Sequence, residues 1–177
     1  YALSNFIKTR SDSFNDFNIY NVTKTLEVST SNQLVYALEK GLRPVCVPGS
    51  KAETVFEKAK EILRDICNDD MTNVEKARAI YEWIILNNSY DHKAADEITG
   101  NNWFEYDSWF AEGVFISKKA VCDGICKAFL IMAKIEGIPT IRVTGNAHAW
   151  NKVYLNGAWF GVDATHGDLS VSGSYEA

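Results

Sequence analysis

The sequence predicts a domain of mixed helix and strand, in which helices come first and an antiparallel hairpin comes near the end. Three capping boxes, beginning at Thr30, Ser50 and Thr72, each precede apolar residues at helical spacing. The dipeptide Asn156-Gly157 separates two apolar-rich runs, which is the strongest short signal for a two-residue hairpin. These local signals predict helices and strands in one chain.

The composition indicates a globular chain. It has 177 residues, of which 46% are hydrophobic and 12% aromatic, enough to fill a core. The net charge is −5 and the only adjacent basic pair is Lys118-Lys119, so no nucleic-acid partner is expected. The longest strongly apolar stretch, FLIMA at 129–133, is far too short to span a bilayer. We therefore expect no membrane span in this fragment.

Changes in patterning suggest three parts. Residues 1–28 are polar and weakly periodic, which predicts an extended arm or short strands. Residues 29–170 form the predicted folded domain, and 171–177 a tail or linker. The chain begins with Tyr1 and has no signal-peptide pattern, so we interpret it as a piece excised or processed from a longer protein.

The first helices follow from their caps. One begins at Thr30 and ends at Gly41, and a short strand with edge prolines follows within 42–49. Two longer helices begin at Ser50 and Thr72 and run back to back across a turn at 68–70. Their stripes are assigned to the core: Val55, Phe56, Ala59, Ile62, Leu63 and Ile66, then Ala77, Ile80, Tyr81, Ile84 and Ile85.

Residues 86–117 carry seven aromatic side chains without a steady period. The aromatics favour an ordered, packed loop over a disordered one, and long irregular segments in compact domains are usually functional or disordered. Two interpretations stay open: the segment walls a substrate cleft, or it forms a hydrophobic lid over the core.

The last third has clear boundaries. A helix runs from Cys122, ends at Gly137 and cannot resume because of Pro139. A strand over 140–145 follows, and then the two runs 148–155 and 158–165 that flank the hairpin turn.

Four cysteines are too few for a disulfide framework. Cys46 and Cys67 are interpreted as buried filler, with a bridge between them as the alternative. Cys122 is different, because it lies in the first turn of a helix, where free N–H groups and the helix dipole favour a negative charge. This position predicts a lowered thiol pKa, a reactive thiolate and N–H groups able to stabilise an oxyanion.

The hairpin selects the base for this thiol from three histidines. With Asn156-Gly157 as the turn, Trp150 faces Asp163 and His148 faces Thr165. His148 and Asp163 therefore share one face as diagonal neighbours, with their backbones about 7–8 Å apart across the strand pair, and a one-residue slip would separate them. Cys122, His148 and Asp163 supply nucleophile, base and orienting carboxylate, the logic of a catalytic triad that needs no cofactor.

Two other interpretations compete with the triad. Cys122, Cys126, His148, Asp163 and His166 could be proposed as zinc ligands, although the spacing of the cysteines is not that of a usual zinc knuckle and no second pair follows. The domain could also be a binding module that keeps an enzyme fold without turnover.

The segments AVCDGICKAFLIMAKIEGIPTIRVTG and HAWNKVYLNGAWFGVDAT resemble the core of the transglutaminase-like superfamily, and MTNVEKARAIYEWIILNNSYD resembles the helix and Tyr-Asp that precede the cysteine in bacterial members. The resemblance covers roughly residues 30–168. It implies an α+β fold of papain-like type, with the nucleophile-bearing helix packed on an antiparallel sheet and extra N-terminal helices. It also places catalytic roles on Cys122, His148 and Asp163.

The sequence differs from the family pattern at one position and leaves one family role unassigned. Cys126 replaces a residue that is often small or aromatic, and it lies one turn deeper on the face of Cys122, so we expect it to be buried. The second oxyanion donor is not assigned, with Asn88, Tyr90 and Trp109 as candidates.

The expected activity is thiol-dependent acyl transfer on protein or peptide amides, with hydrolysis preferred over cross-linking. The alternatives are a transglutaminase that cross-links glutamine to lysine, and a non-catalytic surface binding module that keeps the fold. The expected setting is that of an exported bacterial surface protein acting on cell-wall or surface proteins.

Overall fold

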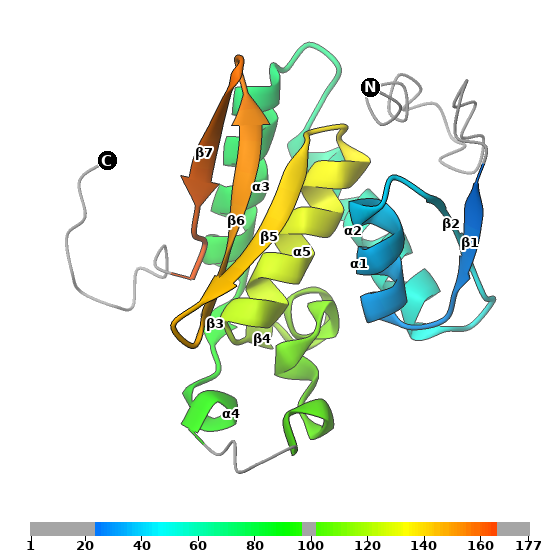
Figure 1. Ribbon diagram of the computed structural model, residues 1–177, viewed down its shortest axis with the longest axis vertical. Helices are drawn as coiled ribbons and strands as arrows, with labels where there is room; N and C mark the ends of the chain where they lie inside the picture. The colour runs from blue at the N-terminus through cyan, green and yellow to red at the C-terminus, as the bar shows by residue number, and fades with distance from the viewer. Residues whose placement is uncertain (1–23, 97–101, 166–177) are drawn as a thin grey trace.

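The computed structural model describes residues 24–96 and 102–165 (Figure 1). Most of the expected arm at 1–28 and the whole tail at 171–177 lie outside the described residues. In chain order the elements are β1 (Thr25–Val28), α1 (Ser31–Glu39), β2 (Arg43–Cys46), α2 (Lys51–Ile66), α3 (Asn73–Asn87), β3 (Ser89–Tyr90), α4 (His92–Asp96), η1 (Asn102–Glu105), η2 (Asp107–Trp109), η3 (Gly113–Ser117), β4 (Lys119–Ala120), α5 (Cys122–Ile135), β5 (Thr140–Gly145), β6 (His148–Leu155) and β7 (Ala158–Val162). The elements η1 and η2 are 3-10 turns, and η3 is a π-helical turn.

The helix α5 forms the centre of the fold. It packs against β5 and β6 on one side and against α1, α2 and α3 elsewhere (Figure 1). Every residue of α5 except Asp123 is buried, as expected for a helix that is apolar on nearly all faces. The predicted α+β class, with this helix on an antiparallel sheet and extra N-terminal helices, is confirmed.

The sheet to which α5 packs has the order β5-β6-β7, with both neighbouring pairs antiparallel. Asn156 and Gly157 have φ values of 49° and 87°, the left-handed conformation that a type I′ hairpin turn needs at both central residues. The pairing runs from Leu155–Ala158 to Asn151–Val162, which is the predicted register. The strand β7 ends at Val162, so Asp163 lies just beyond it rather than within the strand.

The predicted caps are formed with one difference. Thr30 and Thr72 make complete capping boxes with Gln33 and Glu75. The Ser50 side chain accepts a hydrogen bond from the Glu53 N–H, but the Glu53 carboxylate accepts from the Gly49 N–H at 2.6 Å. The Glu53 carboxylate therefore binds the N–H of Gly49, one residue before the N-cap, whereas in a standard capping box it would bind the N–H of Ser50 itself.

Two short parallel pairs complete the backbone. The strand β1 pairs with β2, so part of the segment expected to be an arm or short strands is a strand of the domain. The strand β3 pairs with β4, with Tyr90 opposite Ala120. This pairing brings the end of α3 next to the start of α5, although 34 residues lie between them in the chain.

The described part of 86–117 is a chain of short helical turns. Both η2 and η3 pack against α5, and Phe115 in η3 is 1% exposed whereas Phe104 in η1 is 60% exposed. The lid interpretation therefore fits η2 and η3, and a role as a cleft wall stays a prediction for η1.

Each of the four cysteines is a thiol rather than half of a disulfide, so Cys46 and Cys67 form no bridge. Cys67 is buried as expected, whereas Cys46 is only half-buried because it lies at the end of the short strand β2. None of the helices within 24–96 and 102–165 is long and apolar enough to cross a membrane.

Candidate active site

Cys122 is the first residue of α5. Val121 caps the helix in an extended conformation, and its N–H donates to the Ser108 carbonyl at 3.0 Å. The Cys122 residue is only 6% exposed. The thiol therefore lies at the positive end of the central helix, as predicted, but in a buried position.

Burial changes the expected acidity of this thiol. It raises the pKa of Cys122 above its ordinary value, and the negative charges of Asp123 and Asp163 add to the rise. The N–H groups of Ala149 and Asp123 oppose it, because they stabilise a thiolate. The prediction of a lowered pKa from the helix terminus is therefore wrong, since desolvation outweighs the helix N–H groups. A thiol in this setting needs a base to take its proton.

His148 is the first residue of β6 and directly follows a tight turn. Asn146 and Ala147 in this turn both have positive φ values, 51° and 58°. A left-handed conformation costs an alanine about 1–2 kcal/mol, so the turn is held by the pairing of β5 and β6 on either side. The turn fixes the direction in which the chain enters β6, and with it the place of the imidazole.

The imidazole and the predicted carboxylate meet. Nε2 of His148 is 2.7 Å from Oδ2 of Asp163, with both side chains a little over a quarter exposed. The second oxygen, Oδ1, accepts a hydrogen bond from the Thr165 N–H at 3.0 Å. The ring of His148 also stacks on Trp150, with centroids 5.8 Å apart. The Asp163 carboxylate is thus fixed by the backbone, and it in turn orients the imidazole.

The helix start and the histidine strand are in contact. Cys122, Cys126 and Ala149 form a small cluster of buried residues, and Ala149 directly follows His148. The charge of Asp163 also acts on the thiol of Cys122. The three residues predicted from the sequence therefore gather at one end of the interface between α5 and the sheet.

The three candidate oxyanion donors differ in their surroundings. Nδ2 of Asn88 donates to the Ile84 carbonyl at 3.0 Å and so serves the end of α3. The indole Nε1 of Trp109 is buried and has no hydrogen-bond partner among the described residues, so Trp109 stays a candidate.

Tyr90 is placed next to Cys122 by the pairing of β3 with β4. Burial raises the pKa of Tyr90, the Cys122 thiol adds to the rise, and the Cys122 N–H opposes it. The phenol therefore lies within the electrostatic reach of both the sulfur and the first N–H of α5.

A polar network missed by the sequence analysis fixes the approach to α5. The Asp91 carboxylate accepts hydrogen bonds from the Ser108 hydroxyl and the Ala94 N–H, and it pairs with Lys119 at 3.2 Å. Asp91 is 8% exposed. The Tyr-Asp dipeptide after α3 was a visible signal, but nothing in the sequence links it to Ser108.

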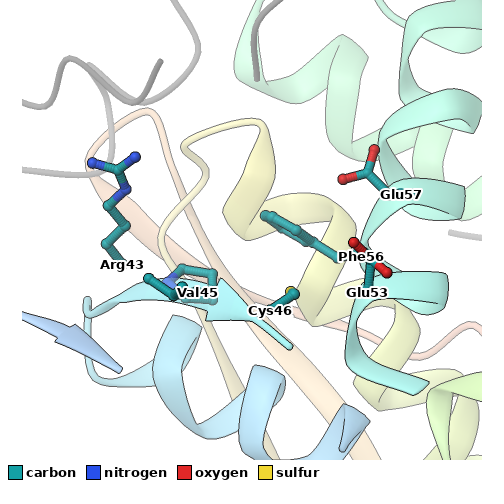
Figure 2. Close-up of a pocket in the computed structure, with 7 residues that line it drawn as sticks. Arg43, Val45, Cys46, Glu53, Phe56 and Glu57 are labelled. Atoms are coloured by element: carbon teal, nitrogen blue, oxygen red, sulfur yellow. The ribbon is translucent and has the colours of Figure 1, made fainter. Parts of the chain in front are cut away.

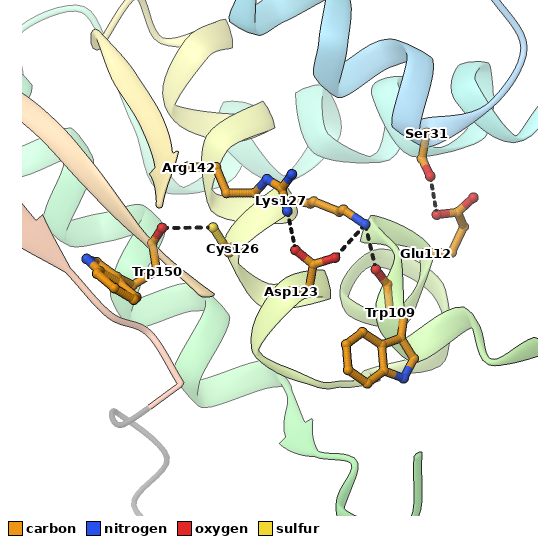
Figure 3. Close-up of polar contacts among 8 residues, drawn as sticks. All are labelled: Ser31, Trp109, Glu112, Asp123, Cys126, Lys127, Arg142 and Trp150. Atoms are coloured by element: carbon orange, nitrogen blue, oxygen red, sulfur yellow. Dashed lines mark hydrogen bonds and ion pairs between the residues drawn. The ribbon is translucent and has the colours of Figure 1, made fainter. Parts of the chain in front are cut away.

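A second network joins the first turn of α5 to its neighbours (Figure 3). One oxygen of Asp123 pairs with Arg142 on β5 at 2.6 Å and the other with Lys127 at 2.7 Å. The Lys127 ammonium also donates to the Trp109 carbonyl at 2.8 Å. Because Asp123 follows Cys122, this network limits the movement of the helix start.

Pockets lie at several places on the described structure. One of about 380 Å³ lies between α3 and the β6–β7 hairpin and has Asp163 in its lining, together with Tyr81 and Val162. Another of about 420 Å³ lies beside Asp123, Lys127 and Arg142. The first therefore borders the candidate site at Asp163, whereas the second lies beside the first turn of α5, and neither lining includes Cys122 or His148.

The third pocket, of about 250 Å³, lies between β2 and α2 (Figure 2). Glu53 and Glu57 lie on one side of it, Arg43 on the other, and Cys46 at its base. Burial raises the pKa of the Cys46 thiol to about 11, which keeps this thiol protonated near neutral pH. None of its residues belongs to α5, β6 or β7, so this pocket is separate from the candidate site.

The zinc interpretation has no counterpart in the described residues. Within 24–96 and 102–165, no group of three or more His, Cys, Asp or Glu side chains is arranged to hold a metal ion. The Cys126 thiol donates to the Trp150 carbonyl instead, and His166 lies outside the described residues.

Comparisons with known proteins agree with this architecture. Residues 60–164, more than half of the chain, match the model of the transglutaminase-like superfamily. The chain is 29% identical over 130 residues to kyphoscoliosis peptidase of Mus musculus, which covers 64% of this chain and 19% of that protein. It is 30% identical over 123 residues to kyphoscoliosis peptidase of Homo sapiens, covering 60% of this chain and 18% of that protein.

The chain thus spans about a fifth of the length of these curated relatives. A solved structure described as a TGase superposes with a TM-score of 0.57 at 16% identity, covering 82% of this chain and 40% of that one. The fold and the match over residues 60–164 lead to one conclusion: the chain belongs to the transglutaminase-like superfamily.

Proposed function

We propose that this domain transfers acyl groups from protein or peptide amides through Cys122, His148 and Asp163, with water as the preferred acceptor. The observation that carries the proposal is the 2.7 Å contact between Nε2 of His148 and Oδ2 of Asp163, beside the helix that begins with Cys122. Peptidase is the name of both curated relatives, which favours hydrolysis. Cross-linking is the alternative.

The proton transfers follow from the orientation of the imidazole. Because Nε2 contacts the Asp163 carboxylate, Nδ1 is the nitrogen that takes the proton from the Cys122 thiol. The carboxylate holds the ring in this tautomer and stabilises the imidazolium. The role of His148 is decisive because the raised pKa of Cys122 leaves little thiolate without a base.

The thiolate then attacks the amide carbonyl carbon, and the oxygen becomes an oxyanion. The Cys122 N–H and the Tyr90 hydroxyl are the proposed donors to it, since the phenol lies near both the sulfur and that N–H. The imidazolium gives its proton to the departing amine, which leaves a thioester on Cys122. Water then attacks the thioester, His148 takes the proton of the water, and the acid and the thiol are released.

A competition experiment separates the two acyl acceptors. The protein is incubated with casein and with a peptide library, in the presence of a fluorescent primary amine. We expect new peptide termini, found by mass spectrometry, to exceed amine incorporation. Cys122→Ala and His148→Ala should abolish both products. More amine incorporation than cleavage would show that cross-linking is the main reaction.

The same experiment tests the binding-module alternative. If the wild-type protein and Cys122→Ala give identical product profiles, the domain has no turnover on these amides and the enzymatic proposal is wrong.

The extracellular, exported bacterial setting and a cell-wall or surface substrate remain proposals supported by the acidic net charge of −5 and by the resemblance to bacterial members. Fractionation of cells that express the full-length gene would test them.

A further inference from the structure

Two hydrogen bonds, one buried and one partly buried, join α5 to β6 directly behind the candidate site. The Cys126 thiol donates to the Trp150 carbonyl at 3.1 Å (Figure 3). The Asn151 side-chain amide donates to the Cys126 carbonyl, also at 3.1 Å. Cys126 is 1% exposed and Asn151 2% exposed, so both donor side chains are shielded from water.

The two bonds match the spacing of the proposed catalytic residues. Figure 1 shows that α5 and β6 run in the same direction. From Cys122 to Cys126 the helix advances about 6 Å, and from His148 to Trp150 the strand advances about 6.6 Å. A fixed contact between Cys126 and Trp150 therefore keeps Cys122 level with His148, one helical turn away.

The chemistry of Cys126 suits a permanent donor. Burial raises the pKa of its thiol far above the ordinary value, and the charge of Asp123 adds to the rise. The sulfur thus keeps its proton at all pH values at which the protein would work. A buried amide such as that of Asn151 likewise costs free energy unless it is paired, so both groups oppose any slide of the helix along the strand.

We propose that Cys126 and Asn151 are positioning residues, which set the register of α5 against β6 and thereby hold the Cys122 sulfur within reach of the His148 imidazole. This inference rests on the proposed function, because it assumes that His148 takes the proton of Cys122. Neither residue touches a substrate in this scheme. Cys126 thus acts on the reaction indirectly, by holding α5 in place, rather than only filling space in the core.

The test measures the alkylation rate of Cys122 by iodoacetamide against pH. The sulfur displaces iodide, and fragment-ion mass spectrometry separates Cys122 from Cys126. For the wild-type protein we expect the plot of alkylation rate against pH to have two parts. The near-neutral limb is the reaction near pH 7 that depends on His148, and the high-pH limb is the reaction of thiolate formed without the help of a base. His148→Ala should leave only the high-pH limb.

Cys126→Ala and Asn151→Ala should reduce the near-neutral limb by roughly 10- to 100-fold, because small displacements of reacting groups cost that much. They should leave the high-pH limb in place. Cys126→Ser keeps a donor and should stay within about threefold of the wild type in this limb. Val153→Ala is the matched control, since Val153 is fully buried on the same face of β6. It should lower the melting temperature without changing the pH profile.

Each outcome decides the proposal. If Cys126→Ala and Asn151→Ala keep the wild-type near-neutral limb while His148→Ala loses it, the pair of Cys122 and His148 stands and the positioning role is wrong. If Val153→Ala loses the limb as completely as they do, the effect is general destabilisation and the positioning role is again wrong. If the wild type has no limb that depends on His148, the proposed function itself fails, and this inference fails with it.

Discussion

His148 and Asp163 lie fifteen residues apart in the chain and meet across the open end of the β6–β7 hairpin, with Nε2 2.7 Å from Oδ2. The contact depends on the two-residue turn at Asn156-Gly157, because its register places both side chains on one face. The hairpin therefore does two things. It covers α5, and it brings a carboxylate to the imidazole next to Cys122.

The first prediction concerns this contact. Asp163→Asn should lower kcat by about 10²- to 10⁴-fold, since an amide no longer enforces the tautomer or stabilises the imidazolium. Circular dichroism should show an unchanged fold, because the asparagine oxygen still accepts from the Thr165 N–H. The rate of cleavage of casein peptides measures the effect. Wild-type turnover in Asp163→Asn would exclude Asp163 from the mechanism.

The second prediction concerns the close approach of η2 to α5. A Cβ on Gly124 would lie 2.3 Å from the Ser108 carbonyl oxygen and 2.8 Å from that of Phe110. Gly124→Ala should therefore cost about 1–3 kcal/mol or more of unfolding free energy, as overpacking against backbone does. It should also displace the start of α5 and reduce turnover. Urea denaturation with a parallel activity assay measures both.

Gly161→Ala is the control for this change, because an added Cβ there meets nothing within 4 Å. Its unfolding free energy and turnover should both stay near those of the wild type. Equal stability of the two variants would mean that η2 moves aside at no cost.

The third prediction concerns stability at high pH. Burial raises the pKa of Cys46 in the folded protein to about 11, whereas an unfolded thiol titrates near 8.5. Between these values the unfolded chain loses the proton that the folded protein keeps, so the free energy of unfolding should fall as pH rises through this window. Cys46→Ala should flatten the fall, as measured by thermal melts from pH 8 to pH 11.

Val45→Ala serves as the comparison, because it changes the neighbouring half-exposed side chain and keeps the thiol. It should retain the slope of the wild type. A Cys46→Ala profile parallel to the wild type would show that the thiol does not contribute to alkaline unfolding.

The fourth prediction concerns a buried ion pair between α3 and the end of α5. Lys76 and Glu136 lie 2.9 Å apart, with side chains 9% and 0% exposed. Lys76→Met leaves the buried carboxylate without its lysine and should cost about 3–5 kcal/mol. The double change Lys76→Met with Glu136→Leu should recover most of that loss, because neither charge is then buried. Guanidinium denaturation of the two single variants and the double variant completes the cycle. A double variant as unstable as Lys76→Met would argue against this account.

The sequence alone determined what depends on neighbours in the chain. The caps at Thr30 and Thr72, and so the starts of the two helices, follow from hydrogen bonds within one helical turn. The turn at Asn156-Gly157 fixed the register of the hairpin, and so predicted that His148 and Asp163 would share a face. The place of Cys122 at a helix start was likewise readable from the sequence.

Only the tertiary structure decided how these parts meet. Whether the helix terminus or desolvation controls the pKa of Cys122 depends on the packing of Ala149 and Asp163 around it, which no local pattern encodes. Tyr90 reaches Cys122 through the parallel pairing of β3 with β4. The Cys126 thiol finds its acceptor on Trp150, twenty-four residues away. Such contacts follow from the side-by-side packing of distant elements, whereas sequence signals act over a few residues. The sequence therefore predicts the candidate residues, and their acidity and spacing are set by the fold.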